Sequence, residues 1–250
     1  MKAADIIAAL NLPPETRINQ RVPKKLLVEN SAPTAADKRQ INEGIEELLW
    51  LAALKPTTIG VPEYRDDVRE YLEIAVLSLA IRQDAKFGRL IELIHRAIPY
   101  PLLLVTEQGD YMTLSLAHKR WSQGEVGKMV LDDVITLCEL VQHAAKEAFL
   151  DSLFLAAQPR VHLLDFYQGW INCLEAFLAA QITGHFILSN GSKKTDARRR
   201  ALGEYDRLAH QIANLRTQAE KEPQINRRVG LNLEIKRLEA QRAEAIKRME

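Results

Sequence analysis

The chain of 250 residues lacks the features that mark membrane-spanning and disordered proteins. It contains no run of 18 apolar residues, so we expect no segment to span a membrane. Its 11 glycines and 10 prolines are not in excess. With 47% hydrophobic and 27% charged residues, the composition predicts a globular protein with one large domain and a smaller appendage.

Cysteine is also scarce. Cys138 and Cys173 are the two cysteines, and both lie in apolar segments that we predict to be helical. Neither has the spacing of a metal ligand, so buried free thiols in a reducing compartment are expected. The N-terminal apolar stretch includes Asp5 and turns polar after about ten residues, too short for a signal peptide. We therefore expect a soluble, cytoplasmic protein.

Charge is distributed unevenly along the chain. Residues 192–250 carry 5 Lys and 10 Arg against 2 Asp and 7 Glu, a formal charge of +6, whereas the whole chain has +1. The rest of the chain is therefore acidic, at −5. This division suggests an anionic partner for the C-terminal segment, or docking of that segment on its own body.

Two segments are apolar at both odd and even positions, so both faces of an extended strand would be apolar. They therefore predict central β-strands. Residues 45–55 are bounded by Pro56 and a turn-rich stretch, and residues 71–82 are richer in β-branched side chains. Residues 85–97 have apolar positions at helical spacing. Residues 101–120 predict a β-hairpin that turns at Gly109, which adopts a positive φ at little cost.

The N-terminal segments complete the predicted fold. Residues 3–11 predict a short helix, residues 17–30 a basic extended stretch, and residues 35–44 a helix capped by Thr34 with Asp37 in its first turn. The resulting order, α-β-β-α-β-β, predicts an α+β protein with a mainly antiparallel sheet and helices on one face. Residues 125–157 and 161–188 are predicted to be helical, and residues 189–196 form a linker.

The last quarter of the chain predicts two helices separated by a break at Pro223. Their apolar residues alternate at spacings of three and four, as in a coiled coil, and Arg242 interrupts the second run. We predict an antiparallel, coiled-coil-like hairpin, and three domains: 1–124 (sheet domain), 125–190 (helices packed on it) and 191–250 (basic hairpin). The predicted seam consists of Tyr205, Leu208, Ile212, Leu215, Ala219, Leu231, Ile235, Leu238 and Ala245.

Several separated segments resemble a known bacterial family. They are VPKKLLVEN, IEELLWLAALKPTTIGVP, YLEIAVLSLAIR, IHRAIPYPLLLV, LSLAHKR and QINRRVGLNLEIKRL. In this order they resemble the family catalogued as domain of unknown function 4391, over roughly residues 1–245. The resemblance implies a gene beside Swi/Snf-type helicases and DNA methyltransferases in restriction or phage-defence loci, and hence a helicase or methyltransferase as partner.

A basic group could form where the helix at 85–97 meets the hairpin. His118, Lys119 and Arg120 leave the second hairpin strand together, and His95 and Arg96 end the helix. If the two elements pack side by side, these residues could bind phosphate, with His118 as an acid or base. The alternative is structural: a solvated strand end with one packed histidine, and a helix terminus whose cations interact with the helix dipole.

Nuclease chemistry is a weaker alternative. A metal-dependent nuclease holds Mg²⁺ with carboxylates on adjacent strands, and Glu47 and Glu73 lie on the two predicted central strands. Glu73 could instead pair with Lys55. The chain has no Walker, G-x-S-x-G, H-E-x-x-H or paired C-x-x-C motif, so we predict no metal site and no cofactor, with Mg²⁺ required only if the nuclease alternative holds.

The C-terminal helices carry a second set of candidate phosphate ligands. Arg198, Arg199 and Arg200 cover nearly a full helical turn, and Arg227 and Arg228 follow the break. They could contact a nucleic-acid backbone, or form a solubilising charged face.

Three functions remain open from the sequence. The first is a non-catalytic accessory or adaptor protein of a bacterial DNA-modification or antiphage defence system that binds a protein partner, with DNA as a second candidate ligand. The second is a metal-dependent nuclease acting on DNA. The third is a self-associating structural protein that dimerises through its C-terminal helices.

Overall fold

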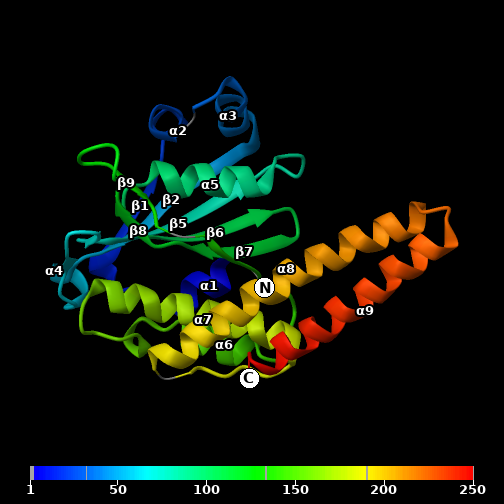
Figure 1. The fold of residues 1–250 in the computed structure, drawn as a ribbon. Helices are drawn as coiled ribbons and strands as arrows, with labels where there is room; N and C mark the ends of the chain where they lie inside the picture. The colour runs from blue at the N-terminus through cyan, green and yellow to red at the C-terminus, as the bar shows by residue number, and fades with distance from the viewer. Residues whose placement is uncertain (1–2, 32, 133, 190, 250) are drawn as a thin grey trace. The chain divides into compact units, whose positions relative to one another are not determined.

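The computed structural model describes residues 3–31, 33–132, 134–189 and 191–249 (Figure 1). The chain forms two compact units, one up to Leu174 and one from Glu175 onwards. Within the described residues, no helix combines the length and apolarity needed to cross a membrane. The mixed α+β composition and the C-terminal helical region agree with the prediction.

The first unit is built on a six-stranded sheet in the order β1-β2-β5-β6-β7-β10. All neighbouring strands are antiparallel except β5 and β6, which are parallel. The predicted central strands are confirmed at β2 and β5, and Gly109 has the expected positive φ, 59°, between β6 and β7. The strands of this sheet are β1 (Arg17–Arg21), β2 (Ile45–Leu54), β5 (Ile74–Ile81), β6 (Leu102–Gln108), β7 (Tyr111–Leu116) and β10 (Thr136–Glu139).

Short elements and helices complete the chain. Two small antiparallel ribbons pair β3 (Tyr64–Arg65) with β4 (Glu70–Tyr71) and β8 (Lys119–Trp121) with β9 (Met129–Leu131). The helices are α1 (Ala3–Leu10), η1 (Pro14–Thr16), α2 (Lys24–Ser31), α3 (Ala35–Arg39), η2 (Gln40–Gly44), α4 (Pro56–Ile59), α5 (Phe87–Ala97), α6 (Lys146–Ser152), η3 (Leu155–Ala157), α7 (Leu163–Thr183), α8 (Ser192–Lys221) and α9 (Ile225–Lys247).

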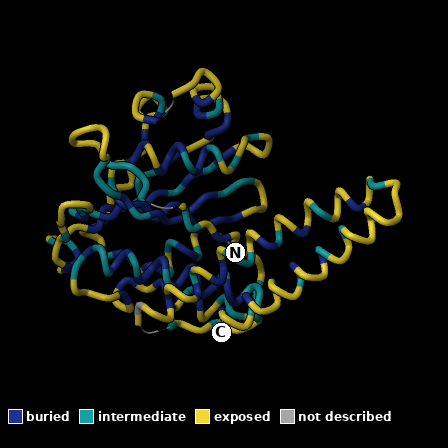
Figure 2. Tube along the Cα trace, in the orientation of Figure 1, coloured by how far each residue is buried: buried dark blue, intermediate teal, exposed yellow. Residues whose placement is uncertain are grey.

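Helices cover both faces of the sheet, so the prediction of helices on one face is wrong. Figure 1 shows α2, α3 and α5 on one side, and α1, α6 and the first half of α7 on the other. The physical reason is the parallel pair: β5 and β6 are buried on both faces and are joined through α5. A parallel connection requires such a crossover, and the second face then needs its own cover. Figure 2 shows the central strands buried.

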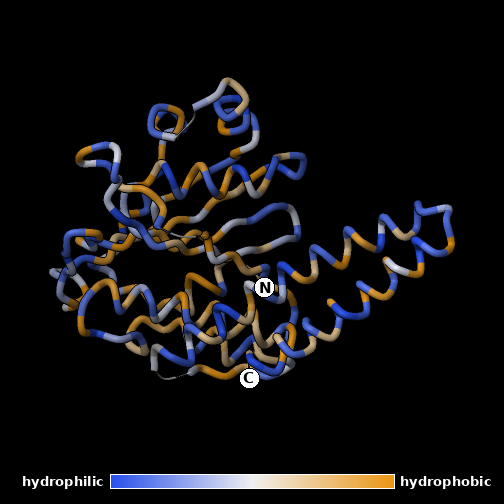
Figure 3. Tube along the Cα trace, in the orientation of Figure 1, coloured by the Kyte–Doolittle hydropathy of each residue, from blue (hydrophilic) through white to orange (hydrophobic). Residues whose placement is uncertain are grey.

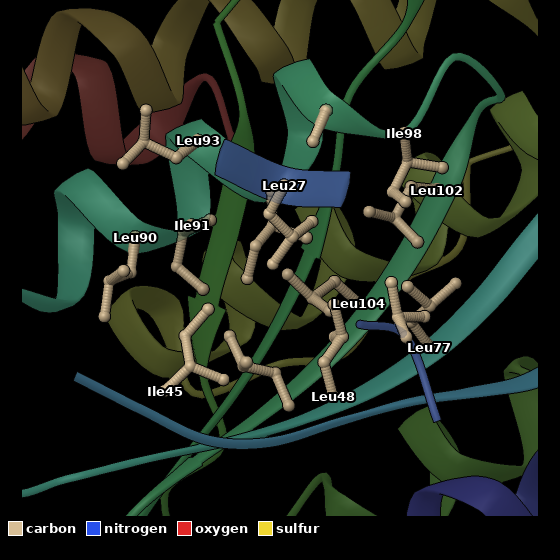
Figure 4. Close-up of a cluster of buried hydrophobic side chains, with 14 of the residues drawn as sticks. Leu27, Ile45, Leu48, Leu77, Leu90, Ile91, Leu93, Ile98, Leu102 and Leu104 are labelled. Carbon is tan, nitrogen blue, oxygen red and sulfur yellow. The ribbon is translucent and has the colours of Figure 1, made fainter. Parts of the chain in front are cut away.

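The core between the sheet and α5 is aliphatic (Figure 4). Ile91 and Ile94 of α5 and Leu77 and Leu104 of the two parallel strands are at most 1% exposed. Leu27 of α2 joins this cluster. The apolar residues at helical spacing in 85–97 therefore face the sheet. This packing sets the position of the last turn of α5 relative to the strands.

Three local predictions are wrong. Residues 129–131 and 136–139 form β9 and β10, although the segment 125–157 was predicted to be helical; Cys138 accordingly lies on a strand. Residues 24–31 form α2 instead of extended chain. In β10 the pairing with β7 decides the conformation, because the edge of β7 offers unpaired backbone groups that a four-residue strand can satisfy.

Two local predictions are confirmed. Thr34 caps α3, where its side chain accepts a hydrogen bond from the Asp37 amide at 3.1 Å. Cys138 and Cys173 are both free and buried, and burial raises the pKa of the Cys173 thiol.

The second unit contains the end of α7, then α8 and α9. Helix α8 ends at Lys221 and α9 begins at Ile225, so the break falls at the predicted Pro223. Apolar and polar residues alternate along both helices in Figure 3. Two ion pairs, Arg248 with Glu204 and Arg216 with Glu239, link the helices at 2.8 and 2.6 Å. One apolar cluster between them contains the predicted seam residues Leu208, Ile212, Leu215, Ala219, Leu231, Ile235 and Leu238.

Candidate functional site

Lys119 is the most unusual of the predicted site residues because its side chain is only 1% exposed. Its ammonium group donates hydrogen bonds to the carbonyl oxygens of His95 and Ile98, at the C-terminal end of α5. The last carbonyls of a helix lack intrahelical donors and carry partial negative charge, so a cation there is favourable. Burial nevertheless lowers the pKa of Lys119 to about 7.

His95 lies beside Lys119 and is fully buried. Its Nε2 atom is 3.0 Å from the Ser115 hydroxyl on β7. Burial, and then the charge of Lys119, lower the pKa of His95 to about 3. The structure thus brings two predicted residues together, but it encloses them between α5 and the sheet, out of reach of a solute.

His118 points to the opposite side of the chain from Lys119, as alternation along an extended strand requires. Its Nδ1 atom lies 2.5 Å from the Tyr71 hydroxyl, and its Nε2 atom lies 2.8 Å from Oε1 of Gln168. Because an amide oxygen only accepts, Nε2 carries the proton and Nδ1 accepts from Tyr71. Both ring nitrogens are engaged by side chains of the protein.

Arg120 and Arg96 are paired with acidic residues. Arg120 lies 3.3 Å from Asp132, which also accepts from Arg69 Nε at 2.8 Å. Arg96 pairs with Glu92 one turn earlier in α5, at 2.6 Å. The five residues of the predicted basic group therefore divide among a buried pair, a histidine network and two ion pairs. Sequence reasoning missed Tyr71, Arg69, Asp132 and Gln168, since no local motif links them.

The two carboxylates of the nuclease alternative lie at opposite ends of one strand pair. Glu47 pairs with Ala80 near the end of β5, whereas Glu73 precedes Ile74, which pairs with Leu54. About seven residues of strand separate them, roughly 23 Å, so they cannot share one metal ion. Glu73 pairs with Lys55 at 3.2 Å, as anticipated. The described residues hold no group of three or more His, Cys, Asp or Glu side chains that could bind a metal.

Two of the three neighbouring arginines of α8, Arg198 and Arg199, bind side chains of the second unit. Arg199 pairs with Glu175 at 2.5 Å, and this carboxylate is 3% exposed. Burial raises the pKa of Glu175, against the effect of Arg199. Arg198 is also buried and donates to the Ser189 hydroxyl at 2.8 Å. Arg200, Arg227 and Arg228 are exposed, so these three are accessible to a phosphate backbone.

A groove in the first unit was not predicted from the sequence. It measures about 550 Å³ and lies among β1, α2, β2 and the loop after α5. Trp50 and Tyr100 line it with their ring centroids 6.2 Å apart, and the paired Lys55 and Glu73 also line it. The sequence contains Trp50 and Tyr100 on separate elements, but it does not show that they lie side by side, because that depends on how the strands pair.

An apolar row on α9 was also missed. Ile225, Val229 and Leu233 are 66%, 52% and 63% exposed. They recur every fourth residue and therefore lie along one side of the helix. We call these three residues the α9 stripe. Their spacing was present in the sequence, but the stronger seam of the same helix concealed it.

A family model for the domain of unknown function DUF4391 matches residues 10–241. The chain belongs to the DUF4391 family. No curated protein and no solved structure matches the chain. Because the DUF4391 description specifies no chemistry, the function has to be argued from the exposed and buried side chains themselves.

Proposed function

We propose that this DUF4391 protein is a non-catalytic accessory or adaptor protein of a bacterial DNA-modification or antiphage defence system. It binds a partner protein, and its C-terminal helices act as a coiled-coil-like hairpin that presents the binding surface. The observation that carries the proposal is the α9 stripe, three exposed apolar side chains aligned on a helix whose other apolar face already packs on α8. Aligned apolar surface of this kind is typical of a protein-binding site.

The state of the titratable candidates supports a non-catalytic role. A general acid or base must reach its substrate within hydrogen-bond distance. His95 and Lys119 are enclosed, and both nitrogens of His118 bind side chains of the protein. The nuclease alternative relied on Glu47 and Glu73, which lie at opposite ends of the β2–β5 pair, so we do not propose it.

DNA contact is a secondary part of the proposal. Lys193, Lys194, Arg200, Arg227 and Arg228 are exposed on the C-terminal helices. Cations at such positions contribute sequence-independent affinity for phosphate that falls steeply with salt. They would strengthen an assembly formed on DNA without selecting its sequence.

Co-purification tests the proposal. The full chain is co-expressed with a Swi/Snf-type helicase and a DNA methyltransferase, the two proposed partners. We expect one of them to co-purify with the wild type, and recovery to fall at least about tenfold with the double variant Val229→Glu, Leu233→Glu, since charges cannot be buried unpaired.

The matched control is Val161→Glu, at an apolar position of similar exposure, 69%, in the first unit. It should leave recovery unchanged. Co-purification of neither protein would refute the adaptor function, and equal recovery with the double variant would refute the role of α9.

A further inference from the structure

Helix α9 has two apolar faces in its first half, and this decides what its free face can bind. At 100° per residue, the α9 stripe is centred roughly 150° from the face formed by Leu231, Ile235 and Leu238. That second face is the one packed against α8. The stripe is therefore nearly opposite the seam, and it extends over nine residues, about 12 Å along the helix axis from Ile225 to Leu233.

The surroundings of the stripe are basic. The segment from Ile225 to Leu233, INRRVGLNL, contains two arginines and no acidic residue. Arg228 lies to one side of the stripe, Arg237 to the other, and Lys236 continues its line; all three are exposed. The nearby Glu239 turns towards α8, where it pairs with Arg216 at 2.6 Å. Glu234 reaches Arg237 at 3.5 Å, which leaves Arg228 and Lys236 as the dominant charges.

We propose that the α9 stripe binds an acidic amphipathic helix of a partner protein, an inference that rests on the adaptor function above. A helix with apolar residues at spacings of three and four would lay them along Ile225, Val229 and Leu233. Glutamates or aspartates beside those residues would meet Arg228 and Lys236, giving complementary charge around an apolar centre.

Charge argues against the other occupants. A second copy of α9 would bring Arg228 and Lys236 close to their own counterparts, and like charges across an interface are unfavourable. A nucleic acid would satisfy the cations but leave the three aliphatic side chains without apolar contact. An acidic helix satisfies both sets of side chains.

Fluorescence anisotropy on the full chain tests the proposal. The probe is a synthetic helical peptide with leucines at spacings of three and four and glutamates on both flanks. A control peptide keeps the leucines and replaces each glutamate by lysine. We expect the acidic peptide to bind and the basic one to bind at least about tenfold more weakly.

Two variants of exposed residues assign the contact. Leu233→Gln should weaken the acidic peptide at least about tenfold, and the pair Arg228→Gln, Lys236→Gln should weaken it and reduce its dependence on salt. Both changes are compatible with a helix, and circular dichroism checks that helix content is kept. Equal binding of the two peptides, no binding of the acidic one, or dimerisation in light scattering that Leu233→Gln abolishes would each overturn the proposal.

This experiment separates the inference from the adaptor function. If the helicase or methyltransferase co-purifies with the Leu233→Gln variant as with the wild type, the adaptor function holds and the assignment of the stripe fails. If the acidic peptide binds but neither protein co-purifies, the stripe is assigned correctly and those two partners are wrong.

Discussion

At the scale of single residues, a lysine without a carboxylate partner stands out. Lys119 uses its ammonium group to satisfy the last carbonyls of α5. A lysine in the unfolded chain has a pKa near 10.4, and burial lowers the pKa of Lys119 to about 7 in the folded state. The unfolded chain therefore binds more protons between these values, and the contribution of Lys119 to stability increases as pH rises from about 7 to about 10.4.

Replacing this lysine should remove that pH dependence. In Lys119→Met, the free energy of unfolding is expected to lose most of its rise with pH above about 7, since the buried lysine that releases a proton on folding is then absent. Urea denaturation between pH 7 and pH 10 measures the slope. Lys38→Met, at an exposed lysine of α3, is the control and should retain it. Parallel curves for wild type and Lys119→Met would contradict the assignment.

His95 should make the stability of the protein depend on pH in the acid range. A histidine in the unfolded chain has a pKa near 6.5, and burial lowers the pKa of His95 to about 3. Its contribution to stability is complete above about pH 6.5 and is lost as pH falls towards 3, because the unfolded state takes up the proton first. His95→Gln should flatten the decline in melting temperature over this range, whereas His185→Gln, at an exposed histidine, should not. An unchanged decline in His95→Gln would disprove this.

At the scale of elements, α7 depends on one glycine. A Cβ atom at Gly169 would lie 2.5 Å from Oε1 of Gln158 and 2.7 Å from Cδ of Pro159. Gln158 cannot move freely, because its amide donates to the Ser152 carbonyl at 2.7 Å. The close approach of the preceding loop to α7 thus requires the absence of a side chain.

Gly169→Ala should destabilise the protein by about 1–3 kcal/mol through overpacking, despite the better helix propensity of alanine. The control is Gly203→Ala in α8, where no atom lies within 4 Å of the added Cβ, and a gain of about 0.5–1 kcal/mol is expected. Thermal denaturation of both variants measures the two changes. An increase in stability in both variants would show that the loop at Gln158 and Pro159 moves away from the added methyl group at position 169.

The sequence predicted those elements whose own residues determine them. The apolar run at 74–81 forms a central strand that is buried on both faces, and the run at 45–54 forms the neighbouring strand, whose last three residues are buried. The strand Thr136–Glu139 was missed because its conformation is imposed by pairing with β7. The burial of Lys119 could not be foreseen, since it depends on where α5 ends relative to β8. The Lys55–Glu73 pair was foreseen because both residues adjoin strand ends, which antiparallel pairing brings together.

At the scale of the whole molecule, the near-neutral charge hides two opposite parts. Residues 192–250 carry +6 within a chain of +1 and a pI of about 7.8. Molecules with such a division should attract one another at low ionic strength near their pI, because the basic part of one meets the acidic part of the next.

Static light scattering at pH 7.8 checks this expectation. The second virial coefficient should be negative at roughly 20 mM NaCl and rise towards positive values at about 300 mM, where charges are screened beyond about 6 Å. The variant Lys193→Glu, Lys194→Glu, at two exposed lysines, should reduce the attraction at low salt. A coefficient that does not respond to salt would indicate that the two parts neutralise each other within one chain.

The parallel pair β5–β6 has a consequence for the order of folding events. The strands and α5 between them come from one continuous stretch, residues 74–108, so their contacts close a short loop. By contrast, the edge strand β1 is exposed throughout, and the edge strand β10 buries only Cys138. Early structure in the transition state should therefore centre on the crossover unit, and φ-values should be high for truncations such as Leu104→Ala and low for Cys138→Ala at the buried position of the edge strand β10.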